Sequence, residues 1–129
     1  MEKMMTNEMN TTFNTEQLAK VLDKTPAGIT VIDKDGHILY YNEYCARFVD
    51  RKPEYIGKNI AFCHKKPESM QKIKKILSEI NEGKRKEFYY EAQRGTNKLS
   101  VTVTPFDIDG KQIGFIQCFS IIHEKPSQK

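Results

Sequence analysis

The side chain with the clearest capacity for chemistry is His64, which lies in the segment AFCHKKP at residues 61–67. A neutral imidazole can ligate a metal, including haem iron as its single axial protein ligand. The alternative is a surface or capping histidine that hydrogen-bonds the backbone where the next helix begins. The residues themselves leave both interpretations open.

Cys63 directly precedes His64, so the pair raises the question of a joint metal or redox site. Adjacent side chains on an extended segment point in opposite directions, which makes coordination of one ion by both a poor geometry. A buried, inert thiol is the favoured interpretation of Cys63. The remaining cysteines and histidines lack the ligand spacing of a zinc site; they are Cys45, Cys118, His37 and His123.

The sequence contains none of the motifs GxSxG, HExxH or GxxxxGK[ST]. Its paired acids, Asp33 with Asp35 and Asp107 with Asp109, lie in expected turns, where such residues set backbone geometry. We therefore expect a protein that is not an enzyme.

Length and composition indicate one globular domain, because 129 residues suffice for a single core. Three widely spaced cysteines indicate a reducing compartment, and no apolar run approaches the roughly 20 residues that span a bilayer. We expect a cytoplasmic protein without membrane contact. The net charge of +4 is mild, and no nucleic-acid-binding motif accompanies the lysines of residues 65–86, so we expect no nucleic-acid partner.

The first expected helix covers residues 13–22 and has a well-formed start. Asn14 is placed to cap it, and Gln17 follows three residues later, as in a capping box. Leu18, Val21 and Leu22 form one apolar stripe. Because so short a helix is unstable alone in water, the stripe must bury against another surface.

Further helical segments follow. Residues 43–49 form a short helix after Asn42, with apolar positions at Tyr44, Ala46, Phe48 and Val49. One more turn is expected at Pro53–Ile56. A longer helix begins at Pro67 and ends at Gly83. Its apolar residues recur at helical spacing and are Met70, Ile73, Ile76, Leu77 and Ile80.

Five strands complete the expected elements, at residues 28–33, 37–42, 86–94, 98–106 and 111–122. The first two form a hairpin around the turn DKDG at residues 33–36. The fourth strand alternates strictly, with Leu99, Val101 and Val103 on one face and Ser100, Thr102 and Thr104 on the other. The fifth is apolar on both faces, which is typical of a central strand.

This order of elements, with D-x-D-G-H-I-x-Y-x-N at residues 33–42, resembles the PAS domain family. The resemblance covers residues 14–122 and implies an α+β fold. That fold is a five-stranded antiparallel sheet with helices on one face and an N-terminal amphipathic helix. We expect a disordered lead at residues 1–12, a single PAS domain at 13–122 and a polar tail at 123–129.

Haem-binding PAS sensors take their iron-ligating histidine from the region of the long helix. The C-H-x-x-P segment is similar to a Cys-His-Pro stretch of PAS domains joined to haemerythrin-like domains, although there the proline follows the histidine closely. The resemblance implies a cavity between the long helix and the sheet, with His64 as the haem-iron ligand. The apolar lining would come from Met70, Ile73, Leu77, Val101, Val103 and Phe115. Lys65, Lys66 or Lys72 would meet the propionates.

A covalent flavin adduct is disfavoured. Blue-light-sensing PAS relatives carry G-x-N-C-R-F-L-Q, and this chain has GKNIAFCH at residues 57–64. Ile60 stands where the adduct-forming cysteine would be, and Cys63 comes three residues too late. The chain also has no tryptophan to stack on a flavin.

The aromatic residues of the strands have two interpretations. They are Tyr40, Tyr41, Phe88, Tyr89 and Tyr90. They either line a ligand cavity with hydroxyl donors or pack across strands, and packing is favoured. Because side chains alternate along a strand, only some of them can reach one cavity.

We therefore expect a cytoplasmic PAS-type sensory or regulatory module. It binds a small molecule or cofactor between long helix and sheet and signals through a homodimer or a partner protein. The cofactor is unassigned, with haem b held by His64 as one alternative. The other alternative is a ligand-free protein–protein interaction module that dimerises, which a small or absent cavity would favour.

Overall fold

The computed structural model describes residues 12–60, 67–84 and 86–123. Its helices are α1 (Thr15–Lys24), α2 (Glu43–Phe48) and α3 (Pro67–Asn81), with a 3-10 turn η1 (Pro53–Tyr55). Its strands are β1 (Gly28–Asp33), β2 (Ile38–Tyr41), β3 (Phe88–Arg94), β4 (Asn97–Ile108) and β5 (Lys111–Ile121). The elements and their order are those predicted. In the described residues, no helix combines the length and the apolar character needed to cross a membrane.

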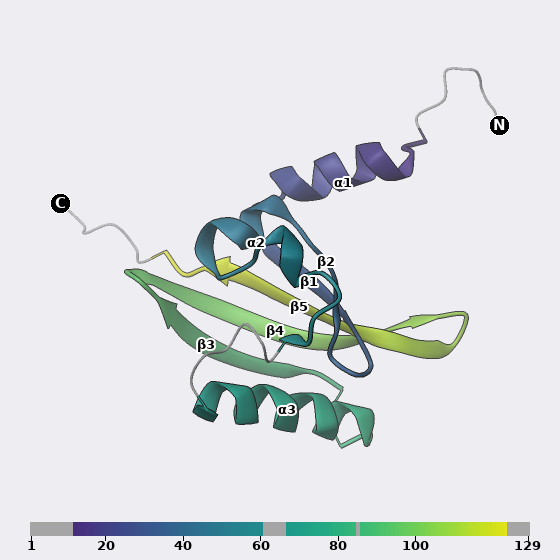
Figure 1. The fold of residues 1–129 in the computed structure, drawn as a ribbon, viewed down its shortest axis with the longest axis vertical. Helices are drawn as coiled ribbons and strands as arrows, with labels where there is room; N and C mark the ends of the chain where they lie inside the picture. The colour runs from purple at the N-terminus through teal and green to yellow at the C-terminus, as the bar shows by residue number, and fades with distance from the viewer. Residues whose placement is uncertain (1–11, 61–66, 85, 124–129) are drawn as a thin grey trace.

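The strands form one antiparallel sheet in the order β2-β1-β5-β4-β3. β5 is central, as its apolar character predicted. The helix α2, the turn η1 and the helix α3 pack against one face of this sheet, called here the inner face (Figure 1). The fold is therefore the predicted α+β arrangement.

Two hydrophobic clusters hold the helices on the inner face. The α3 cluster contains Ile32, Ile38, Tyr55, Ile60, Ile73, Ile76, Ile80, Val103 and Phe115. The α2 cluster contains Cys45, Leu99, Val101 and Phe119. The predicted alternation of β4 is confirmed, since Leu99, Val101 and Val103 are buried while Ser100, Thr102 and Thr104 are half-buried. The inner face is thus apolar under both helices, and a polar group there needs a specific partner.

Helix α2 differs from its predicted pattern. Its buried residue is Cys45, whereas Ala46, predicted as an apolar position, is exposed. The Asn42 side chain caps the helix by accepting a hydrogen bond from the Cys45 amide. This cap fixes the rotation of the short helix and directs Cys45 at the sheet.

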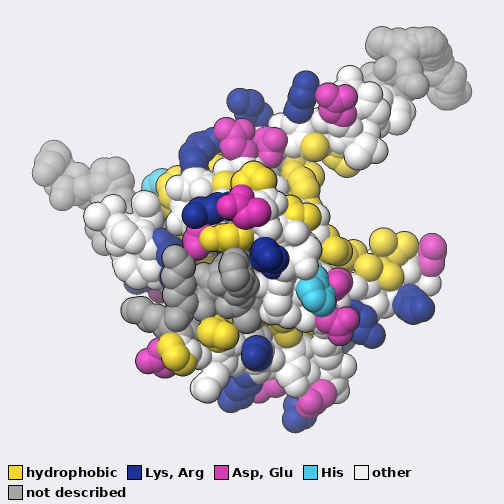
Figure 2. Space-filling view, in the orientation of Figure 1, with side chains coloured by type: hydrophobic (Ala, Val, Ile, Leu, Met, Phe, Trp, Pro, Cys, Tyr) yellow, Lys and Arg dark blue, Asp and Glu magenta, His cyan; other side chains and the backbone are white. Residues whose placement is uncertain are grey.

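Helix α1 has the predicted start. The Asn14 side chain accepts from the Gln17 amide at 2.7 Å, and the Gln17 side chain accepts from the Asn14 amide at 3.0 Å. No residue of α1 is buried, and Leu18 and Val21 are 49% and 45% exposed. Figure 2 shows hydrophobic side chains at the surface along this helix. The expected burial of the stripe is not met within a single copy of the described chain.

Two glycines have structural roles that a larger residue would disturb. Gly83 follows α3 with a φ of 77° and ends the helix as predicted. Gly114 of β5 lies against β1 so closely that an added Cβ would collide with the backbone carbonyl of Ile32. A side chain at Gly114 would therefore disturb the pairing of β5 with β1.

Candidate ligand-binding site

Two polar side chains interrupt the apolar inner face at the same place. Thr30 of β1 is 1% exposed and Gln117 of β5 is 9% exposed. The two residues are direct partners across the strand pair, and strand alternation turns both side chains toward the helices. Burial of such groups is unfavourable unless they are hydrogen-bonded.

Arg51, which follows α2, supplies those hydrogen bonds. Its Nη2 donates to Gln117 Oε1 at 3.0 Å and its Nε donates to Thr30 Oγ1 at 3.3 Å. Its Nη1 donates to the Asp50 carbonyl oxygen at 3.0 Å. All three acceptors are uncharged. The Asp50 carboxylate is directed elsewhere, since it accepts from the Tyr55 hydroxyl at 3.2–3.3 Å.

The hydrogen bonds continue from Gln117 to Tyr90 of β3, whose hydroxyl oxygen accepts from Gln117 Nε2 at 3.0 Å. An arginine only donates, so Arg51 fixes the Gln117 amide with its oxygen toward Arg51 and its NH₂ toward Tyr90. Burial raises the pKa of the Tyr90 hydroxyl, while the Gln117 hydrogen bond and the charges of Arg94 and Arg51 oppose the shift. Tyr90 is therefore a neutral phenol at neutral pH.

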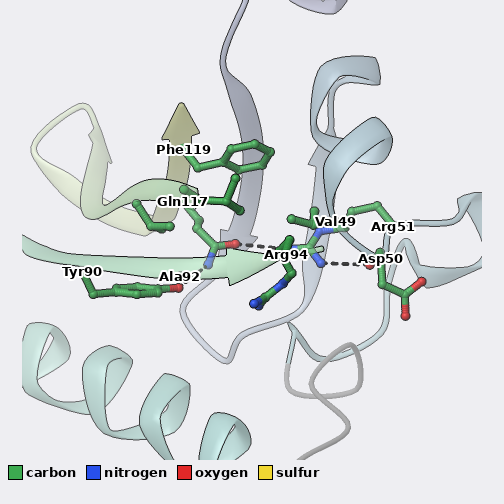
Figure 3. Close-up of a pocket in the computed structure, with 10 residues that line it drawn as sticks. Val49, Asp50, Arg51, Tyr90, Ala92, Arg94, Gln117 and Phe119 are labelled. Carbon is green, nitrogen blue, oxygen red and sulfur yellow. Dashed lines mark hydrogen bonds between the residues drawn. The ribbon is translucent and has the colours of Figure 1, made fainter. Parts of the chain in front are cut away.

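A cavity of about 50 Å³, called here the Arg51 cavity, lies beside these groups. Its lining residues are Val49, Asp50, Arg51, Tyr90, Ala92, Arg94, Leu99, Val101, Gln117 and Phe119. Figure 3 shows Arg51, Gln117 and the hydroxyl end of Tyr90 in line, with the Arg94 side chain in the same region. The volume suits roughly four water-sized groups. The lining thus combines polar groups with apolar side chains.

Thr30 connects the cavity to α2. Its hydroxyl lies 3.2 Å from the Sγ of Cys45. Burial raises the pKa of the Cys45 thiol, although the nearby Arg51 charge and the Thr30 hydrogen bond oppose this shift. Cys45 is therefore a protonated thiol at neutral pH and has the character of a packing residue rather than a nucleophile.

Asn42 joins α2 to α1 and β1, and we call its contacts the Asn42 junction. Its Nδ2 donates to the carbonyls of Leu22 at 2.7 Å and Ala27 at 2.9 Å. Its Oδ1 accepts from the amides of Ile29 at 2.9 Å and Cys45 at 3.1 Å. The side chain is 0% exposed, and these four bonds satisfy its full capacity.

The structure separates the predicted lining residues into two groups. Ile73, Val103 and Phe115 lie in the α3 cluster, with Leu77 packed against it and Met70 half-buried on the same helix. Val101 lies in the α2 cluster, and of the six predicted residues that the structure describes it alone lines the Arg51 cavity. Their role in binding stays a prediction.

The predicted haem ligand His64 lies outside the described residues, as do Cys63, Lys65 and Lys66. The apolar residues predicted to line a haem cavity include three that are packed into the α3 cluster. Haem ligation therefore stays a prediction.

The aromatic residues divide between the two faces of the sheet. Phe88 and Tyr90 pack with the inner clusters, as does Tyr41, whereas Tyr89 is 57% exposed. Packing and cavity lining are not exclusive, because Tyr90 does both. The paired acids of the first turn behave as predicted, since Asp33 Oδ1 accepts from the amides of Asp35 and His37 at 2.9 and 2.8 Å.

The sequence reasoning missed Arg51, Gln117 and Thr30. Gln117 carried the best available signal, a long polar side chain inside a strand predicted to be apolar on both faces. The sequence gives no sign that Arg51 belongs to a site, because the charged neighbours Asp50 and Lys52 are typical of a surface loop. The two side chains are 66 residues apart and meet only in the folded chain.

A family model described as a PAS domain matches residues 18–119. The chain is similar in structure to a C-terminal domain from Streptococcus mutans, with 27% identity, a TM-score of 0.72 and coverage of 84% and 85% of the two chains. It is similar to the PAS domain of BvgS from Bordetella pertussis, with 20% identity, a TM-score of 0.69 and coverage of 85% and 87%. No curated protein matches it significantly.

A third similar structure is the PAS domain of the quorum-sensing receptor RpfR from Cronobacter turicensis, solved in complex with BDSF. Its identity to this chain is 16% and its TM-score is 0.55, with coverage of 78% of this chain and 97% of that one. At this identity the likeness concerns the fold.

Proposed function

The chain belongs to the PAS domain family of sensory modules, and we propose that it senses a small molecule bound in the Arg51 cavity. The observation that carries this proposal is the chain of hydrogen bonds from Arg51 through Gln117 to Tyr90 along the cavity wall. Ligand sites in proteins typically combine apolar walls with a few convergent polar groups. The C. turicensis relative in complex with BDSF supports small-molecule binding by this fold.

The proposed site differs in place from the cavity expected between α3 and the sheet. It lies between the segment that follows α2 and the strands β3, β4 and β5. A ligand there contacts Arg51 directly, and α3 contributes no lining residue among those described. The ligand thus acts on the α2 end of the domain.

A continuous set of contacts leads from this cavity to α1. Arg51 donates to Thr30, Thr30 contacts Cys45, and the Cys45 amide donates to Asn42, which holds the C-terminal end of α1 through Leu22. A ligand that repositions Arg51 changes these contacts only if it binds two conformations of the domain with different affinity. We propose that α1 is the element that transmits the change.

The partner that we propose for α1 is a second copy of the chain. The exposed apolar residues Leu18 and Val21 give α1 a stripe that a single copy leaves in water. A short amphipathic helix gains most of its stability from burial of such a stripe. We place the homodimer in the cytoplasm, because the cysteine composition indicates a reducing compartment.

The alternative is a ligand-free dimerisation module. It is favoured by the small size of the Arg51 cavity, since sites for drug-sized ligands measure roughly 300 to 1,000 Å³. In this alternative the Arg51 cavity contains only water, and α1 serves association alone.

Native mass spectrometry of the purified protein, with an absorption spectrum, separates the two functions. We expect a bound mass beyond the polypeptide that disappears in the cavity-filling variant Ala92→Leu. The matched control is Ala46→Leu on the exposed side of α2, which leaves the bound mass in place. If no bound mass is found and no compound of a metabolite library raises the Tm, sensing of a small molecule by this domain is ruled out in favour of the ligand-free module.

A further inference from the structure

We propose that the Arg51 cavity is selective for a small carboxylate of two or three carbon atoms. This inference rests on the proposed function, because it names the ligand class of the same site. It follows from the direction of the hydrogen bonds, from the charges of the lining residues and from the apolar side chains among them.

Among Arg51, Gln117 and Tyr90, the groups left for a ligand are donors, whereas the Asp50 carboxylate, which also lines the cavity, accepts from Tyr55. Within the described residues, Arg51 uses three of its five N–H donors, which leaves one on each terminal nitrogen. Gln117 uses its oxygen on Arg51 and one amide hydrogen on Tyr90. The Tyr90 oxygen is already an acceptor, so its hydroxyl hydrogen is turned to the cavity or to water.

A ligand that binds these donors must offer acceptors, and a carboxylate is acceptor-only when ionised. A carboxylate also matches the two remaining N–H groups of a guanidinium, which it accepts as a pair. An amide or alcohol of the same size would bring a donor of its own into this wall, where it would meet other donors. The site therefore discriminates by polarity as well as by shape.

The charges of the lining residues also favour an anionic ligand. Two arginines, Arg51 and Arg94, and one carboxylate, Asp50, line the cavity, so the charged lining residues carry a net positive charge. The three groups that accept from Arg51 are uncharged. The carboxylate of Asp50 accepts from Tyr55, which directs its charge to that hydroxyl. Arg94 is exposed and lies at the end of β3, where its cation is available to an incoming anion.

The apolar part of the lining restricts the ligand to a molecule with a short carbon chain. It consists of Ala92, Leu99, Val101 and Phe119. With about 50 Å³ available, the cavity admits roughly four or five heavy atoms. An inorganic phosphate would place oxygens against these apolar side chains, whereas acetate or propionate places methyl or methylene groups there.

A titration of the ¹⁵N-labelled protein with sodium propionate, observed by NMR, tests the proposal. We expect saturable shifts of the Gln117 side-chain amide and the Arg51 Nε–H. Propionamide and sodium chloride at equal ionic strength should leave these signals in place. Arg51→Gln should weaken propionate binding by at least a hundredfold, and Tyr90→Phe and Arg94→Gln by about tenfold each.

Arg47→Gln is the matched control, because Arg47 is an exposed arginine of α2 that lies 5.5 Å from the Tyr44 ring, away from the cavity lining. It should bind propionate like the wild type. Arg94 is exposed, so Arg94→Gln should fold normally and tests the site even if Arg51→Gln misfolds. Equal weakening in all the arginine variants would mean a general charge effect and overturn the proposed site.

The other outcomes distinguish this proposal from the function on which it rests. Shifts with propionamide equal to those with propionate, or shifts with inorganic phosphate alone, overturn the carboxylate assignment and leave small-molecule sensing intact. If no probe shifts the NMR signals but native mass spectrometry finds a bound mass, only the carboxylate assignment is overturned. If no probe shifts the signals, no bound mass is found and no metabolite raises the Tm, both proposals are overturned.

Discussion

The Asn42 junction and the Arg51 cavity are two polar sites in the same apolar interior, and they are built differently. Asn42 bonds four main-chain groups and is fully satisfied. Arg51 bonds two side chains and one main-chain carbonyl, with donors to spare among the described residues. The two residues are nine positions apart in the sequence, yet the hydrogen-bonding capacity of Asn42 is fully used and that of Arg51 is not.

The difference shows what each site contributes. Main-chain partners cannot move without unfolding the helix or strand that they belong to, so a side chain that binds four of them fixes local structure. Side-chain partners can rotate, and a donor left over can bind something that is not part of the protein. We therefore expect Asn42 to determine stability and Arg51 to determine binding.

The largest effect is expected for Asn42→Ala. It removes the amide oxygen and the NH₂ group of a fully buried side chain and leaves four main-chain groups, one buried and three half-buried, without that partner. The free energy of unfolding should fall by about 3 to 4 kcal/mol. Urea denaturation measures the change. Asn14→Ala is the matched control, since Asn14 also caps a helix but is exposed, and it should lose about 1 kcal/mol or less.

Thr30→Val tests the connection between the two regions. The change keeps the shape of the side chain and removes the hydroxyl that contacts both Arg51 Nε and Cys45 Sγ. A loss of about 1 kcal/mol in the free energy of unfolding is expected. Thr102→Val, on the other face of the sheet, should change it by less than about 0.5 kcal/mol. A Thr30→Val loss as large as that of Asn42→Ala would place Thr30 in the junction instead.

Arg51→Gln should leave the free energy of unfolding within about 0.5 kcal/mol of the wild type. The variant loses three hydrogen bonds, but it also removes a half-buried charge whose desolvation opposes folding, and water can reach the acceptors in the cavity. The measurement is urea denaturation without added carboxylate. A loss above about 2 kcal/mol would show that Arg51 is a structural residue of the same kind as Asn42, and the comparison would fail.

The smallest effect at neutral pH concerns Tyr90. Burial raises the pKa of its hydroxyl above the ordinary value of 10.0, so the folded state holds this proton more tightly than the unfolded state. The resulting stability is complete below pH 10 and is lost as the pH rises through the folded pKa. Unfolding free energies measured from about pH 8 to about pH 11 should fall less steeply in Tyr90→Phe.

Tyr89→Phe is the control for this pH dependence, because Tyr89 is exposed and lies on the same strand. Its stability should fall with pH as in the wild type. Equal slopes for wild type and Tyr90→Phe would contradict the assignment of a raised pKa to Tyr90.

The fold was predictable from the sequence because its signals are local. The Asn14 cap, the turn at residues 33–36 and the alternation of residues 98–106 each act within a few neighbours, and each is present in the structure. The candidate site was not predictable in the same way. It depends on Arg51 and Gln117, whose meeting follows from the pairing of β1 with β5 and from the position of α2, neither of which has a local sequence pattern.

The burial of Cys45 illustrates the same limit at the scale of one helix. The apolar spacing of residues 43–49 predicted Ala46 as a buried position, but a six-residue helix is too short for its own periodicity to set its rotation. The Asn42 cap sets that rotation instead. Tyr44, Phe48 and Val49 pack against the α2 cluster as the pattern predicted, and Ala46 alone departs from it.

The fixed orientation of the Gln117 amide has a consequence for how such a sensor evolves. Glutamine and glutamate codons differ by one base, so a single nucleotide change can place a carboxylate between Arg51 and Tyr90. That carboxylate would pair with Arg51, accept the Tyr90 hydroxyl hydrogen and occupy the donors that a ligand needs. Under the proposed function, a lineage could thus pass from a ligand-dependent to a permanently occupied state, and back again, in one mutational step without altering the sheet.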